Sequence, residues 1–212
     1  MNAGRSVAAL GLVLGTATLL LQLTLTVTTS MQQGRSLPGA IVFFFSFFTI
    51  LTNIGIVLVY LAEFWQRPAL HFFRESVHRA ALAASIVFVM LFYHLMLARI
   101  WDPQGLFRVA DVTLHYLLPV LYLLWWLGFA AHRHLEWDAL PRMLAYPVIY
   151  VIWVMARGAV VDEYPYPVLE VARLGYAQVL ANIAFLFVLF AALCTAFIAV
   201  DRMIPQRSGA HR

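Results

Sequence analysis

The sequence predicts an all-α membrane protein, with six transmembrane helices packed into one bundle. Its composition supports this class, because 63% of the residues are hydrophobic and only 11% are charged, a balance that ordinary soluble domains do not have. Six apolar runs also approach the length of about 20 residues that a helix needs to cross a bilayer. These runs and their short connections occupy almost the whole chain. We therefore expect one transmembrane domain over residues 1–212 and no separate soluble domain.

Polar or turn-forming residues bound the first three runs. The first run is longer than the apolar core of a signal peptide and lacks a clear cleavage site, so we interpret it as a span. The second follows Pro38 and Gly39 and ends at Glu63, and the third ends before the turn that begins at Asp102. Each boundary is therefore consistent with a helix that leaves the membrane.

The last three runs have less regular boundaries. The fourth begins somewhere between Leu106 and Val112, and the polar segment from His132 follows it. The fifth contains Pro147 and Arg157, and the sixth ends in an arginine-bearing tail. The expected spans are 7–27, 40–62, 80–98, 106–131, 143–161 and 179–200, followed by a tail at 201–212.

Arginine placement predicts the orientation of the bundle. Six spans put both termini on the same side. The N-terminus, the second and fourth connections and the tail hold nine of the fourteen arginines, and the other three connections hold five. Cytoplasmic loops are enriched in basic residues, so we expect both termini to be cytoplasmic.

Several function classes are excluded at this stage. The single cysteine, Cys194, allows neither a disulfide framework nor a cysteine-rich zinc site. The chain has no basic stripe with interleaved aromatic residues and no glycine-rich phosphate loop, so we expect no nucleic-acid partner. We also predict no metal and no cofactor, and we expect membrane lipids as the surroundings.

A polar stripe interrupts the second span, in the run FFFSFFTILTN. Polar groups are costly inside a bilayer, so they suggest a functional site. Small polar residues also hold membrane helices together, so helix packing is the alternative interpretation. The residues of this stripe are Ser46, Thr49, Thr52 and Asn53.

The fourth span carries an ionisable pair in the run DVTLHYLLP. Asp111 and His115 are four residues apart, so the carboxylate can reach the ring and set its tautomer. Pro119 cannot donate a helical hydrogen bond, and we expect a bend there. A histidine held by an acid and facing a hydroxyl is typical of nucleophile activation.

Depth in the membrane leaves two hydroxyl partners open. At 1.5 Å per residue, Thr49 lies about 12 Å below the outer start of its helix. If the fourth helix begins at Leu106, His115 lies at a similar depth of about 13 Å. If it begins at Val112, His115 lies only about 5 Å deep, and Ser46 at about 7 Å is the better match.

Other ionisable residues fall near the same level as His115. Arg157 and Arg99 lie near span edges, where arginine commonly extends to the headgroups. They could instead bind the carboxylate or phosphate group of an amphiphilic substrate. His94 and His115 could also be axial haem ligands of an electron carrier. The remaining histidines lie in loops or the tail, which disfavours a haem protein.

Four motifs, taken in order along the chain, resemble the androgen-induced protein family. The resemblance is to a bacterial-type member of that family. The motifs are FFFSFFTILTN, DVTLHYLLPVLYLLWW, YVIW and EYPYPVLE, and the similarity covers residues 43–200. The resemblance implies six membrane helices with cytoplasmic termini, which agrees with the arginine count. It also implies a location in the bacterial cytoplasmic membrane.

The resemblance further implies an activity. Animal members of this family are described as atypical threonine hydrolases that cleave fatty acid esters of hydroxy fatty acids, with an intramembrane threonine and histidine. The matching residues are Thr49 and His115, so the resemblance favours Thr49 over Ser46. Thr52 departs from the family pattern, because the animal proteins have an acidic residue there, and this affects substrate preference.

The resulting hypothesis is acyl transfer from a lipid ester. Thr49 is the nucleophile, His115 the base, and Asp111 the residue that orients the ring. Asn53 or Thr52 is the candidate oxyanion donor. The alternative is a protein with the same pocket that binds or transports a lipid or small amphiphile without turnover.

Overall fold

The computed structural model describes residues 3–205, and within that range it is all-helical with no strand. Short 3₁₀ turns lie in the connections, and two π-helical turns, η3 (Tyr93–Leu97) and η4 (Thr113–Leu117), extend or join longer helices. Residues 206–212 of the expected tail lie outside the described range. The longer helices are α1 (Ala3–Gln32), α2 (Leu37–Phe44), α3 (Phe48–Ala62), α4 (Ser76–Phe92), α5 (Leu106–Val112), α6 (Leu118–Phe129), α7 (Leu140–Val161) and α8 (Val171–Met203).

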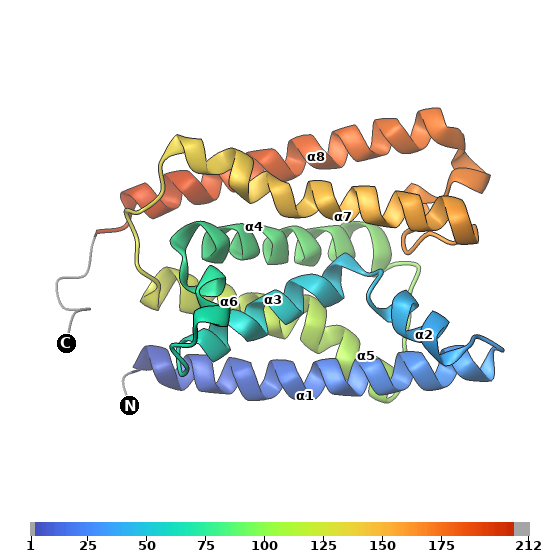
Figure 1. Cartoon of the computed structure of the whole chain (residues 1–212), viewed down its shortest axis with the longest axis horizontal. Helices are drawn as coiled ribbons and strands as arrows, with labels where there is room; N and C mark the ends of the chain where they lie inside the picture. The colour runs from blue at the N-terminus through green and yellow to red at the C-terminus, as the bar shows by residue number, and fades with distance from the viewer. Residues whose placement is uncertain (1–2, 206–212) are drawn as a thin grey trace.

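The helices run back and forth along the long axis of the molecule (Figure 1). Five helical stretches in the described range are long and apolar enough to cross a membrane, and the bent pair α2–α3 makes a sixth. The start of α1 and the end of α8 lie at the same end of the bundle (Figure 1). By the length and composition of its helices, this architecture is consistent with the multi-pass membrane protein that the apolar runs predict.

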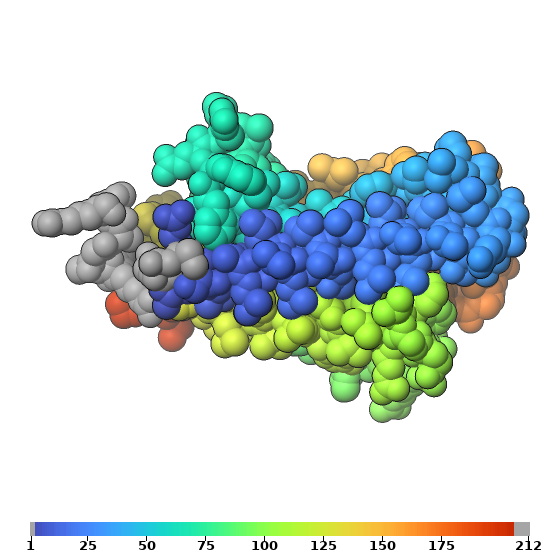
Figure 2. All heavy atoms as spheres, turned by 90° about the horizontal axis from the view of Figure 1, so that it is seen from below, coloured from blue at the N-terminus to red at the C-terminus, as the bar shows by residue number. Residues whose placement is uncertain are grey.

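The helix α4, which corresponds to the third expected span, lies at the centre and packs against α3, α6, α7 and α8. Its buried surface is rich in small residues, which let membrane helices approach closely. The first helix, α1, runs across one face of the bundle, beside α2–α3 and α5–α6 (Figure 2). The small buried residues of α4 are Ala80, Ala81, Ala83, Ala84 and Ser85.

The second expected span is not one straight helix, which corrects the prediction from the sequence. The helices α2 and α3 meet at 73° across residues 45–47, and Phe47 has extended backbone. Ser46 Oγ donates to Val42 O at 2.7 Å, and the Tyr150 hydroxyl on α7 donates to Ser46 O at 2.9 Å. A broken helix is tolerated in a membrane when neighbouring groups satisfy its backbone. Depths measured along one straight helix therefore do not apply here.

The fourth expected span is continuous but changes its helical register. It begins at Leu106, the earlier of the two starts considered. The π turn η4 ends at Leu117, two residues before Pro119, where a bend was expected. In a π turn each N–H bonds to the carbonyl five residues earlier. The next such bond would join Pro119 to Leu114, but proline has no N–H. Asn53 on α3 donates to the Leu114 carbonyl at 3.3 Å instead.

Candidate active site

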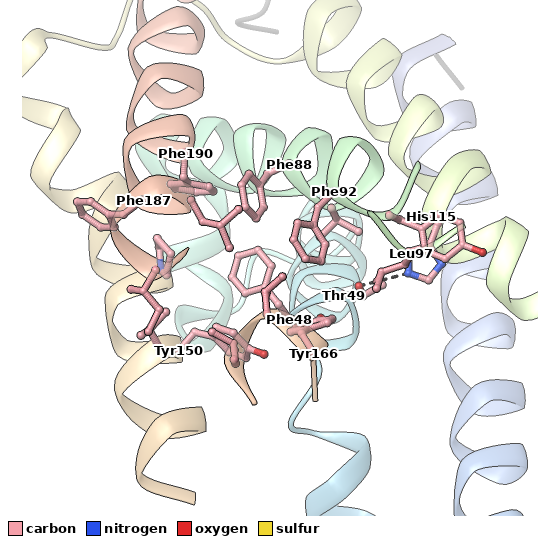
Figure 3. Close-up of a pocket in the computed structure, with 18 residues that line it drawn as sticks. Phe48, Thr49, Phe88, Phe92, Leu97, His115, Tyr150, Tyr166, Phe187 and Phe190 are labelled. Carbon is pink, nitrogen blue, oxygen red and sulfur yellow. Dashed lines mark hydrogen bonds between the residues drawn. The ribbon is translucent and has the colours of Figure 1, made fainter. Parts of the chain in front are cut away.

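The structure brings Thr49 and His115 together from different helices. Thr49 lies in the first turn of α3, directly after the break, and His115 lies in η4. The distance between Thr49 Oγ1 and His115 Nε2 is 3.4 Å (Figure 3). This separation is at the long end for a hydrogen bond, and catalytic hydrogen bonds are often long before substrate binds.

The hydrogen-bond partners of His115 indicate which of its two ring nitrogens carries the hydrogen. His115 Nδ1 lies 2.9 Å from the Asp111 backbone oxygen. A carbonyl oxygen only accepts, so Nδ1 carries the hydrogen. In the neutral ring Nε2 then has a free lone pair, and that atom faces the Thr49 hydroxyl. This is the tautomer that a general base needs.

The carboxylate of Asp111 also contacts the imidazole. Asp111 Oδ1 lies 3.2 Å from His115 Nδ1, and the side chains are only 10% and 14% exposed. The other carboxylate oxygen, Oδ2, accepts a hydrogen bond from the Tyr93 hydroxyl. A positive charge that forms on His115 would therefore have a negative group beside it.

An elongated apolar pocket leads away from the pair. Thr49 and His115 lie at one end of it, and Phe187 on α8 lies at the other (Figure 3). The lining includes Phe88 and Phe92 from α4, and its few polar atoms are those of Thr49, His115 and tyrosine hydroxyls. A pocket of this kind is suited to a hydrocarbon chain with one polar group near the Thr49 end.

The other polar residues of the second span have structural partners. The hydroxyl of Ser46 donates to the Val42 backbone oxygen on α2, and Ser46 does not line the pocket. Thr52 Oγ1 lies 2.9 Å from the Tyr146 hydroxyl. Asn53 Nδ2 donates to the backbone oxygens of Thr49, at 2.8 Å, and of Leu114. The two proposed oxyanion donors are therefore occupied in holding helices together.

The predicted substrate-binding residues lie outside the pocket. Arg157 is buried and donates to both the carboxylate and the backbone oxygen of Glu163. Arg35 also pairs with the Glu163 carboxylate, at 2.5 Å. Burial alone would raise the pKa of Glu163, but the hydrogen bonds and charges of the two arginines lower it overall. Arg99 is exposed.

The predicted histidine pair is also separated. His94 is exposed, and its Nδ1 lies 3.1 Å from the Tyr116 hydroxyl. His115 Nε2 faces Thr49 instead of a shared space with His94. No group of three or more potential metal ligands occurs in residues 3–205. This arrangement does not bring the two rings together as axial haem ligands.

Two tyrosines at the site were missed by reasoning from the sequence. Tyr93 stacks on the His115 ring, with centroids 3.8 Å apart. The Tyr166 hydroxyl lies against the Thr49 hydroxyl and the backbone of Phe48 and Thr49 (Figure 3). The first N–H groups of a helix lack intrahelical acceptors, so this region can stabilise a negative oxygen. The only sequence signal was the position of Tyr166 in the motif EYPYPVLE.

The site thus combines a hydroxyl, an imidazole, a buried carboxylate and an apolar pocket. These groups can transfer a proton from Thr49 to His115 and hold an apolar substrate beside them. No family model, curated protein or solved structure matches this chain.

Proposed function

We propose that this protein is an intramembrane lipid ester hydrolase with Thr49 as nucleophile and His115 as general base. The observation that carries the proposal is that His115 Nε2 faces the Thr49 hydroxyl while Nδ1 is held by the Asp111 backbone oxygen, at one end of an apolar pocket. A structural threonine would not require a histidine whose tautomer is set by a second hydrogen bond.

The reaction proceeds in two halves. As Thr49 Oγ1 attacks the ester carbonyl carbon, its proton passes to His115 Nε2. The tetrahedral intermediate then collapses, the leaving alkoxide takes the proton from His115, and the acyl group remains on Thr49. Water, deprotonated by His115, attacks the acyl carbonyl and releases the acid. Asp111 stabilises the imidazolium in both halves.

The substrate in this proposal is an amphiphilic lipid ester. Its ester group lies at Thr49 and one hydrocarbon chain lies along the pocket towards Phe187. The resemblance to the androgen-induced family favours fatty acid esters of hydroxy fatty acids or similar esters. In the same proposal both termini are cytoplasmic and the protein resides in a bacterial cytoplasmic membrane.

The test uses the purified protein in detergent, with a fluorophosphonate probe and a lipid ester. Thr49→Ala should abolish labelling, and His115→Ala should slow it by about a hundredfold or more. Ser46→Ala is the matched control, because its hydroxyl is three residues away but donates to the Val42 backbone oxygen on α2. Full labelling and turnover in Thr49→Ala would overturn the proposal.

The apolar pocket also favours a second candidate, a protein that binds or transports a lipid without turnover. The same experiment separates the two. In that case the wild type and Thr49→Ala bind the lipid ester equally, and neither hydrolyses it.

A further inference from the structure

The carboxylate beside His115 has a partner on a second helix, Tyr93. The Tyr93 hydroxyl donates to Asp111 Oδ2, while Asp111 Oδ1 faces His115 Nδ1. The Tyr93 ring also lies on the His115 ring, nearly parallel at 15°. One buried residue therefore contacts both the imidazole and the carboxylate that accompanies it.

The position of Tyr93 depends on an irregular helix. It is the first residue of the π turn η3, and His115 lies in the π turn η4. Single π turns inside helices often occur at functional sites, because they redirect side chains. Here two of them face each other, joined by the stacked rings of Tyr93 and His115 and, nearer the surface, by the contact between His94 and Tyr116.

The environment of Asp111 explains why a second donor matters. Its side chain is 10% exposed, and a buried carboxylate is costly unless hydrogen bonds satisfy it. His115 Nδ1 is bonded to the backbone oxygen of Asp111, and the Asp111 carboxylate lies 3.2 Å from the same nitrogen. Because the backbone oxygen already sets the tautomer, the carboxylate is free to turn away from the ring. The Tyr93 hydroxyl is the contact that holds it there.

We propose that Tyr93 is a positioning residue for the Thr49–His115 pair, acting through the Asp111 carboxylate. This inference rests on the proposed function, in which His115 becomes positively charged in the transition state. The hydroxyl keeps the negative charge of Asp111 against Nδ1, and the ring face keeps Nε2 directed at Thr49.

The decisive variant is Tyr93→Phe, which keeps the stacked ring and removes only the hydroxyl. We expect kcat for a lipid ester to fall about tenfold, with KM unchanged, because a hydrogen bond to a charged group is lost. In an Asp111→Asn background the same substitution should have no further effect. Tyr116→Phe is the matched control, because it removes the neighbouring link between the two π turns and leaves Asp111 untouched.

A second measurement does not require turnover. The proton resonance of His115 Nδ1–H moves downfield as a carboxylate approaches it, and Asp111→Asn provides the reference without that charge. Tyr93→Phe should shift the resonance towards that reference, whereas Tyr116→Phe should leave it in place. A wild-type resonance in Tyr93→Phe overturns the role of Tyr93. If the wild type hydrolyses no ester although the resonance shifts as expected, the positioning contact stands and the proposed function fails.

Discussion

Asn53 provides a direct test of how α3 and η4 align the candidate site. It is fully buried, and its Nδ2 donates to Thr49 O at 2.8 Å and to Leu114 O at 3.3 Å. Leucine has a similar size but cannot donate. Pro119 has no N–H to donate to the Leu114 carbonyl. An Asn53→Leu variant therefore leaves that carbonyl without a hydrogen-bond donor.

The expected loss of stability is small. Thr49 O lies inside α3, so the backbone N–H four residues later still serves it, and only the Leu114 carbonyl loses its partner. Hydrogen bonds between membrane helices contribute about 0.6 kcal/mol on average and about 1.7 kcal/mol at most. We expect Asn53→Leu to lose about 1 kcal/mol, or about 2–4 °C in unfolding temperature for a chain of this length.

The expected loss of activity is larger, because Asn53 joins Thr49 to the residue that precedes His115. A displacement of about 1 Å between reacting groups can cost about a hundredfold in rate. We would measure thermal unfolding by circular dichroism and the rate of probe labelling in detergent. Ser85→Ala is the control, since that buried hydroxyl bonds only within its own helix. Equal labelling rates in the two variants would show that Asn53 does not align Thr49 with His115.

Two further predictions concern stability. The folded-state pKa of Glu163 lies below its ordinary value of 4.5, so its ion pairs stabilise the fold above about pH 4.5, and this stabilisation disappears as the pH falls through the lower folded-state value. Glu163→Gln should remove that dependence from a series of unfolding temperatures, and an identical pH curve would contradict the assignment. A Cβ on Gly11 would lie 2.2 Å from the Tyr60 ring, whereas one on Gly128 meets nothing within 4 Å. Gly11→Ala should therefore lose about 1–3 kcal/mol and Gly128→Ala should not; equal unfolding temperatures would argue against close packing of α1 on α3.

Much of the architecture could be predicted from local features of the chain. Each apolar run must form a helix in lipid, because backbone groups have no water to bond to. The spacing of Asp111 and His115 likewise places them on one helical face, whatever the rest of the fold. The break in the second span was not predictable in this way. The Ser46 backbone oxygen in this break accepts a hydrogen bond from Tyr150, which lies on a helix about a hundred residues later.

The residues of the candidate site were likewise only partly predictable from the sequence. Residue type alone pointed to His115 and to two hydroxyls, Ser46 and Thr49, because such groups are unusual in apolar spans. The family resemblance then favoured Thr49 over Ser46. Residue type could not separate Asn53, which holds α3 against η4, from an oxyanion donor. Nor could it find Tyr93, since one tyrosine among many carries no signal until the chain is folded.

Side-chain type and spacing along the chain are therefore enough to predict the apolar helices and the polar groups within them. Packing between distant helices sets which hydroxyl meets the imidazole, which arginines pair with Glu163 and which tyrosine contacts Asp111. Such contacts depend on packing between helices far apart in the chain, where a broken helix or a π turn redirects every side chain that follows.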